Sequence, residues 1–162
     1  MSYRPTRNIE RSIYDFFTFY LIEGDSNHTP WNGLSIVASQ ADAYLKSAPV
    51  LCIQMGITNY ANVQVGNSQY ERTITVILDL YANSEGQQMD LKDAIIDLLA
   101  MGIPYYEYEG DNIVSNSLKG NMNVKIVRDE PLNKNVDKAS LDKMDRYRQR
   151  ITFTLKTGVA EG

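Results

Sequence analysis

Two long segments of the sequence alternate apolar and polar residues, and this period of two constrains the fold more than any other feature. The first segment runs from Tyr70 to Tyr81 and the second from Arg146 to Lys156. Side chains of a β-strand point alternately to the two faces of a sheet, so each segment predicts a strand with one dry face and one polar face. The first strand places Arg72, Ile74, Val76, Leu78 and Leu80 on one face and Glu71, Thr73, Thr75 and Asp79 on the other.

An amphipathic helix is expected directly after the first strand. Ser84 and Gln87 have the spacing of a capping box, in which side chains accept hydrogen bonds from backbone N–H groups at the helix start. Gly102 and Pro104 end the helix. Its apolar stripe has helical spacing and comprises Leu91, Ala94, Ile95, Leu98 and Leu99. The stripe is expected to lie on the sheet.

An earlier helix is expected between Thr6, a suitable N-cap, and Gly24, a suitable C-terminal stop. Apolar residues recur at helical spacing on its core side, namely Ile9, Ile13, Phe16 and Tyr20. Its other side is expected to face solvent and carries Asn8, Glu10, Arg11 and Asp15.

The remaining elements are shorter. We expect a loop at 25–34, a helical turn at 40–46, a buried central strand at Val50–Met55, a turn or hairpin loop at 61–68, and short strands at 103–108 and 123–128. A polar segment, Asp129–Asp145, is expected to be a flexible arm or loop, because it contains Pro131 and few apolar residues. Together these elements predict one α+β domain over residues 1–162, with a mostly antiparallel sheet and two main helices packed on it.

The composition is that of one domain that can bury its own core. No segment approaches the roughly 20 apolar residues that span a bilayer, and the first five residues do not resemble a secretory signal. We therefore expect no membrane partner. Cys52 is the only cysteine and lies in an apolar segment, so we expect it to be buried and to behave as a small hydrophobic residue. A chain with no cysteine pair is expected to assemble in a reducing cytoplasm.

Charge is distributed unevenly along the chain. The formal net charge is −4, yet acidic residues crowd positions 79–111, where Lys92 is the only base, and basic residues predominate from Asn112 onward. An acidic region and a basic region suit head-to-tail pairing between copies. Alternatively, both charged regions are simply solvated surfaces that keep the protein soluble.

The sequence offers no catalytic, cofactor-binding or metal-binding set, and we do not expect an enzyme. His28 is the only histidine and lies in a polar loop, so a multi-histidine metal site is excluded. No Gly-x-Ser-x-Gly elbow, P-loop or dinucleotide-binding fingerprint occurs. Carboxylate pairs such as Asp93 with Asp97 and Glu107 with Glu109 have the spacing of solvated faces.

Three groups of residues are candidates for contacts with partners. The tyrosine cluster Tyr105, Tyr106 and Tyr108 suits a protein interface, because tyrosine combines a large apolar area with a polar tip. The arm supplies four scattered apolar side chains, namely Leu132, Val136, Leu141 and Met144. The last strand supplies Arg146, Arg148 and Arg150, a cationic strip that is able to track phosphates.

The order of these elements resembles that of the terminator and completion proteins in the neck and tail of tailed bacteriophages. The segments that carry the resemblance are the helix Asn8–Ile22, the strand entry Ala48-Pro49-Val50-Leu51, the strand Glu71–Tyr81, the helix Gln87–Met101 and the strand Arg148–Thr157. The resemblance extends over nearly the whole chain and includes no signature motif, so no functional residue is carried over from the family.

The resemblance implies a ring, usually of six subunits, that caps the tail tube and joins it to the head connector. The partners would be copies of the chain itself, tail tube and connector or head-closure proteins, and genomic DNA that passes through the lumen without sequence-specific binding. The implied location is the virion neck or tail, after assembly in the host cytoplasm, and no cofactor takes part. A head-closure or minor tail protein is the alternative within this class. A small nucleic-acid-binding module and a small hydrolase are the alternatives outside it.

Overall fold

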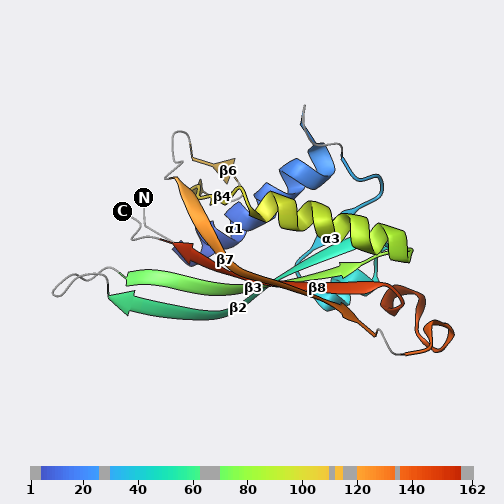
Figure 1. Cartoon of the computed structure of the whole chain (residues 1–162). Helices are drawn as coiled ribbons and strands as arrows, with labels where there is room; N and C mark the ends of the chain where they lie inside the picture. The colour runs from blue at the N-terminus through green and yellow to red at the C-terminus, as the bar shows by residue number, and fades with distance from the viewer. Residues whose placement is uncertain are drawn as a thin grey trace.

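The computed structural model describes residues 5–25, 30–62, 70–109, 112–114, 120–133 and 136–157. His28 lies outside these residues. The chain is a single α+β domain with a mostly antiparallel sheet, as predicted (Figure 1). Its helices are α1 (Pro5–Phe17), the π-helix η1 (Thr18–Glu23), α2 (Gln40–Tyr44) and α3 (Glu85–Leu99). Its strands are β1 (Ser35–Val37), β2 (Val50–Asn62), β3 (Tyr70–Tyr81), β4 (Ile103–Pro104), β5 (Tyr108–Glu109), β6 (Asn112–Ile113), β7 (Asn121–Leu132) and β8 (Arg148–Thr157).

The main sheet has six strands in the order β1-β2-β3-β8-β7-β4. The two segments with the clearest alternation, β3 and β8, lie at its centre and pair antiparallel from Arg72 opposite Thr157 to Tyr81 opposite Arg148. The expectation that Val50–Met55 forms the central strand is wrong. This segment begins the longer strand β2, which lies next to the short edge strand β1.

The main core lies between one face of the sheet and the helices α1 and α3, which lie on the same side of it in Figure 1. Ile74, Val76 and Leu78 of β3 belong to this core, as do Ile151, Phe153 and Leu155 of β8. Leu80, the fourth apolar residue predicted for the core face of β3, is also fully buried. The predicted α3 stripe is also confirmed, because Leu91, Ile95, Leu98 and Leu99 are buried.

The start of α3 is capped nearly as predicted. The Ser84 hydroxyl accepts a hydrogen bond from the Gln87 backbone N–H at 3.2 Å. The Gln87 side chain reaches back to a backbone N–H at 2.7 Å, but this N–H belongs to Asn83 instead of Ser84. The box therefore satisfies donors on both sides of the N-cap, which fixes the point where β3 turns into the helix.

A second, smaller apolar cluster covers the opposite face of the sheet at one end. It comprises Val37, Ala43, Val50, Cys52 and Tyr81, with Met144 packed against it. The helix α2 and the loop between β7 and β8 bring Ala43 and Met144 to this face. The polar face predicted for β3 is therefore wrong at this end, where Asp79 is fully buried.

The first helix differs from the prediction in three respects. The α-helix already includes Pro5, so Thr6 lies inside it and is not the N-cap. After Phe17 the chain continues as a π-helix to Glu23 and ends, as predicted, at Gly24 with a positive φ of 74°. Asn8, which was assigned to the solvent side, is 3% exposed.

The arm expected at Asp129–Asp145 begins later than predicted. The strand β7 continues to Leu132, which pairs with Arg148, so residues 129–132 belong to the sheet. Two short 3₁₀ helices follow, η2 at Lys138–Ser140 and η3 at Lys143–Asp145. The segment is thus partly a strand and partly a structured loop, and its mobility in an isolated subunit stays a prediction.

Candidate functional site

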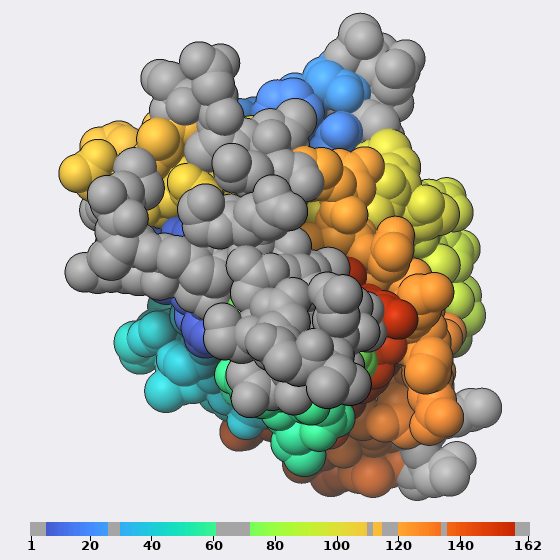
Figure 2. Space-filling model, turned by 90° about the vertical axis from the view of Figure 1, so that its left-hand side faces the viewer, coloured from blue at the N-terminus to red at the C-terminus, as the bar shows by residue number. Residues whose placement is uncertain are grey.

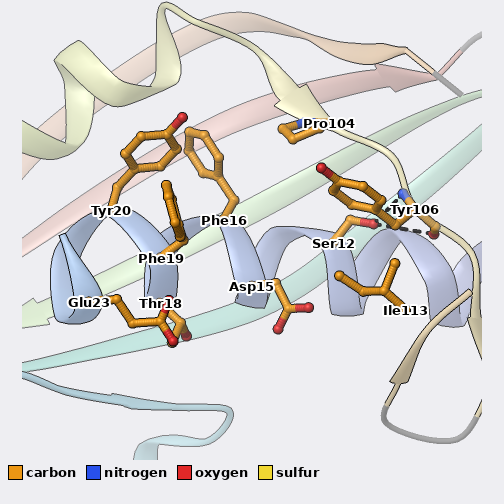
Figure 3. A pocket seen from close by; sticks show the side chains of 10 residues that line it. All are labelled: Ser12, Asp15, Phe16, Thr18, Phe19, Tyr20, Glu23, Pro104, Tyr106 and Ile113. Atoms are coloured by element: carbon orange, nitrogen blue, oxygen red, sulfur yellow. Dashed lines mark hydrogen bonds between the residues drawn. The ribbon is translucent and has the colours of Figure 1, made fainter. Parts of the chain in front are cut away.

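A hollow lined by aromatic side chains lies on the outer side of α1 and η1 (Figure 3). It encloses about 450 Å³ between these helices and the segment that runs from β4 to β6. We call this feature the aromatic hollow; its lining residues are Ser12, Asp15, Phe16, Thr18, Phe19, Tyr20, Glu23, Pro104, Tyr106 and Ile113. Phe19 is 43% exposed and Ile113 is 47% exposed, so the hollow presents large apolar surface to solvent.

The polar side of α1 fixes the tyrosine segment that borders the hollow. Asn8 donates from Nδ2 to the Tyr105 hydroxyl at 3.1 Å and accepts from the Tyr108 backbone N–H at 3.1 Å. Ser12, one turn further along, accepts from the Tyr106 backbone N–H at 3.0 Å. Buried polar groups need such partners, which explains why Asn8 and Ser12 are polar although both are buried.

The three predicted tyrosines therefore have different environments. Tyr105 and Tyr108 are buried, and only Tyr106 lines the hollow. The Tyr108 hydroxyl donates to Asp15 at 2.6 Å. Burial, followed by this hydrogen bond, raises the pKa of Tyr108. The buried pair Tyr105 and Tyr108 holds the segment in place, and Tyr106 is the tyrosine placed to contact a partner.

The π-helix determines how the aromatic side chains of the hollow are arranged. The Gly24 backbone N–H donates to the Phe19 carbonyl at 2.7 Å, five residues back, which is the hydrogen bond of a π-helix. Tyr20 contacts the rings of both Phe16 and Phe19 edge to face, with centroids 5.1 and 4.9 Å apart. Such mutual packing makes the aromatic surface rigid, and π-helical turns are frequent at functional sites.

A buried charged cluster lies on the opposite face of the sheet, beside the second apolar cluster. Asp79 on β3 accepts from Nε of Arg150, its partner on β8, at 2.9 Å. Gln40 at the start of α2 donates to the other Asp79 oxygen at 3.2 Å. Hydrogen bonding to Asp79 raises the pKa of Arg150. The carboxylate is thus satisfied from two elements, as a fully buried charge requires.

Arg148 connects this cluster to the loop before β8. Its guanidinium lies 3.8 Å from Asp79 and 3.6 Å from Asp145, and it stacks over the Tyr81 ring at 4.6 Å from the centroid. Tyr44 of α2 donates its hydroxyl to the same Asp145 at 2.5 Å. Arg148 and Arg150 therefore hold α2 and the loop against the sheet, and their charges are directed into the domain.

The other predicted contact residues are distributed along the loop and its base. Arg146 donates from Nε to the Leu141 carbonyl at 3.3 Å, so it also holds the loop. Met144 packs on the second apolar cluster. Leu132 and Leu141 are half-buried, whereas Val136 is 44% exposed. The structure does not bring the arginines together as a free cationic strip, and Val136 is the most accessible of the predicted apolar residues.

The two long edges of the main sheet were missed by the sequence analysis. On β2, Ile57 is 74% exposed and Tyr60 is 55% exposed. On β7, Ile126 is 66% exposed and Val127 is 39% exposed. The local pattern contained no signal for the β2 edge, because β2 contains no Asp, Glu, Lys or Arg, whereas natural edge strands usually carry charges.

The described residues include no group of three or more His, Cys, Asp or Glu side chains arranged to hold a metal ion. Within the same residues, no helix is long and apolar enough to span a membrane. Neither a protein-family model nor a curated protein matches the sequence.

Proposed function

We propose that this chain is a structural subunit of a tailed-phage virion, of the neck and tail terminator kind. Copies of the chain form a ring that caps the tail tube and joins it to the head connector, and genomic DNA passes through the lumen. The subunit acts by self-assembly and docking, without a cofactor or a chemical reaction. It assembles in the host cytoplasm and functions in the virion neck.

The observation that carries the proposal is the exposure of large apolar side chains in pairs on several sides of one small domain. Ile57 and Tyr60 lie on β2, and Ile126 and Val127 lie on β7. The strands β3 and β8 separate β2 from β7 in the sheet. Phe19 and Ile113 lie at the aromatic hollow. Grouped apolar exposure is typical of protein interaction sites, and a ring subunit needs such sites both toward its neighbours and toward the proteins that it joins.

The order of elements also supports the terminator class. A first helix, a long hairpin, a crossing helix and a long last strand follow one another in the order that the family resemblance implies. Asn8 and Ser12 fix the segment beside the hollow to α1, so a partner would meet a preformed surface. Preformed surfaces suit docking, because little ordering entropy opposes the contact.

Native mass spectrometry of the purified chain tests the ring. The expected result is one closed oligomer of a single subunit number, which the family resemblance puts at six. Added to assembling tail tubes, the ring is expected to stop their growth at one end. A chain that stays monomeric at every concentration, or a ring that binds neither tubes nor connectors, contradicts the proposal. Binding to connectors alone favours the head-closure alternative.

A nucleic-acid-binding module is the second candidate, and one observation favours it. The exposed side chains of Lys125 and Arg128 on β7 stand beside Thr154 and Thr152 of β8, on the face of the sheet opposite α1 and α3. Lysine and arginine on an open sheet are able to contact phosphates without reading sequence. Tight, salt-sensitive binding of DNA by the monomer, abolished in Lys125→Glu/Arg128→Glu, favours this candidate over the ring.

A further inference from the structure

From the strand order and the exposed edge residues, we infer that the copies join by β-sheet addition, with the outer edge of β2 in one subunit pairing antiparallel with the outer edge of β7 in the next. This inference rests on the proposed function, because it specifies how the ring closes. The partner is a second copy of the same chain, and the contact is heterologous, since two different edges meet. Heterologous contacts produce rings when the rotation between copies closes.

Both edges are open over most of their length. The strand β1 covers β2 only from Val50 to Cys52, and β4 covers β7 only at Asn121 and Met122. Within the part of the chain that the structure describes, no strand lies outside β2 from Ile53 to Asn59 or outside β7 from Asn123 to Leu132. Backbone N–H and C=O groups on such edges are a template for another strand.

The strand directions allow one copy to continue the sheet of the next. β2 pairs antiparallel with β3, β3 with β8, and β8 with β7. Three reversals separate β2 from β7, so these two strands run in opposite directions. A neighbouring copy in the same orientation therefore presents its β2 antiparallel to β7, with its helices on the same face of the sheet. The alternation of strand directions continues from copy to copy.

Each edge strand has a bulge, and the two bulges lie at nearly the same level of the sheet. The register of β2 shifts between Met55 and Thr58, opposite Thr75, and that of β7 shifts between Lys125 and Arg128, opposite Phe153. Thr75 on β3 pairs with Thr154 on β8, which is the residue after Phe153. Measured along the strands, the two bulges are therefore offset by one residue. Each bulge turns a β-branched apolar side chain toward solvent, Ile57 on β2 and Ile126 on β7.

The backbone at both bulges is specialised. A Cβ at Gly56 would lie 2.9 Å from the Thr75 carbonyl oxygen, so the close approach of β2 to β3 requires glycine. Ile126 has a φ of 51°, in the left-handed region that β-branched residues rarely adopt. Strained backbone of this kind tends to occur at functional sites. The bulge at Ile126 is thus consistent with an interface position instead of a free edge.

Apolar burial favours contact between β2 and β7 over contact of either edge with itself. The strand β7 carries Lys125 and Arg128 beside Asp129 and Glu130, so its charges do not exclude pairing of two β7 edges. Such pairing would, however, leave Ile57 and Tyr60 of β2 exposed. The strand β2 has no charged residue to repel any edge. Pairing of β2 with β2 would leave Ile126 and Val127 exposed, whereas pairing of β2 with β7 buries the apolar residues of both edges. Figure 2 shows orange residues of the β7 region on the right-hand side of the molecule and cyan residues near 40 on the left-hand side.

A complementation experiment with two edge variants tests the inference. Ile57→Lys places a charge on the β2 edge and leaves β7 intact, and Ile126→Lys does the reverse. Both positions are mostly exposed, so both variants are expected to fold, which circular dichroism and thermal melting verify. The matched control is Leu45→Lys, because Leu45 is 81% exposed and lies at the end of α2, outside both edge strands.

Native mass spectrometry is expected to give rings for the wild type and for Leu45→Lys, monomers for each edge variant alone, and dimers for their equimolar mixture. The dimer forms because the mixture retains one intact β2 edge and one intact β7 edge. The inference is overturned if either edge variant forms rings, if Ile126→Lys alone forms dimers, or if the mixture stays monomeric. In each of these cases a ring formed by the wild type still supports the proposed function. A monomeric wild type instead overturns the proposed function itself.

Discussion

The two faces of the main sheet are built from different residues and have different roles. The face under α1 and α3 is mainly apolar and buries residues such as Val76, Leu78 and Phe153, with the hydrogen-bonded pair Gln88 and Gln149 as a buried polar exception. The opposite face has its small apolar cluster and the Asp79 charged cluster at one end. Beyond that end it carries half-buried threonines such as Thr75 and Thr154. The comparison indicates that the helix-covered face provides most of the stability, whereas the edges are the regions for which we propose contacts between subunits.

The largest effect is expected on the helix-covered face. Leu98→Asp removes a leucine that is 3% exposed and buries a carboxylate in its place. The lost packing and the desolvation together cost about 5 kcal/mol or more, comparable to the whole stability of a domain. The variant is expected to be unfolded by circular dichroism. Asp97→Asn, one residue away on the exposed side of α3, is the control, and a folded Leu98→Asp protein would show that the stripe is not buried.

On the opposite face, the largest effect is expected from Asp79→Ala. This change removes the carboxylate that partners Arg150 and Gln40 and leaves a partly buried guanidinium unpaired. Breaking a buried pair in this way costs about 3–5 kcal/mol. Chemical denaturation measures the loss, with the exposed Asp93→Ala as control. Equal stabilities of the two variants would mean that the cluster does not hold α2 to the sheet.

A smaller effect is expected where α1 holds the tyrosine segment. Asn8→Ala removes the hydrogen bonds to the Tyr105 hydroxyl and to the Tyr108 backbone N–H, and the buried Tyr108 N–H loses this acceptor. The expected cost is about 1–3 kcal/mol for a buried unsatisfied group. Glu10→Ala, on the same helix but exposed, is expected to change little. The free energy of unfolding of both variants tests whether Asn8 is a buried, hydrogen-bonded residue. If neither substitution changes this free energy, the original assignment of Asn8 to the solvent side regains support.

The pH dependence of stability reports on the second apolar cluster. Burial, followed by the nearby charge of Asp79, raises the pKa of the Cys52 thiol from 9.0 to about 11. Between these values the unfolded chain releases a proton that the folded chain retains, so stability falls as pH rises through this range. Cys52→Ala is expected to flatten this fall without removing it, because raised pKa values of Tyr81 and Tyr108 act in the same direction above pH 10. An identical alkaline slope in the wild type and in Cys52→Ala would contradict the buried thiol.

The smallest effect on stability is expected at the sheet edge. Ile57→Lys changes a side chain that is 74% exposed, so the stability of the monomer is expected to stay within about 0.5 kcal/mol of wild type. Thermal melting at concentrations too low for assembly measures it. A large loss of stability would show that Ile57 belongs to the folded core of the subunit instead of its contact surface.

The elements of this fold were predictable wherever one residue pattern decides the structure. The alternation of β3 and β8 and the leucine stripe of α3 gave the right strands, helix and core side. The prediction failed where a second layer covers a polar residue. Asp79 and Asn8 look like surface residues in the sequence, and only the packing of α2, Arg150 and the tyrosine segment makes them buried.

The candidate contact surfaces were less predictable than the fold. The tyrosine cluster was predicted to contact a partner, and this stays a prediction. Which of its tyrosines lines the surface hollow depends on hydrogen bonds between α1 and residues about 95 positions later. The arginines of β8 have the pattern of a cationic strip, yet Asp79 and Asp145 lie close enough to hold Arg148 and Arg150. Edge strands depend on sheet order, which the local pattern does not specify.

Hydrogen–deuterium exchange on the wild-type assembly and on monomeric Ile57→Lys tests the central comparison most directly. In both samples, the amides of β3 and β8 are expected to exchange equally slowly, because these central strands are paired on both sides within one subunit. In Ile53–Asn59 and Asn123–Leu132, the amides that point away from β3 and β8 are expected to exchange slowly only in the assembly, where each edge gains a strand. Equal exchange of both edges in the assembly and the monomer would contradict the account.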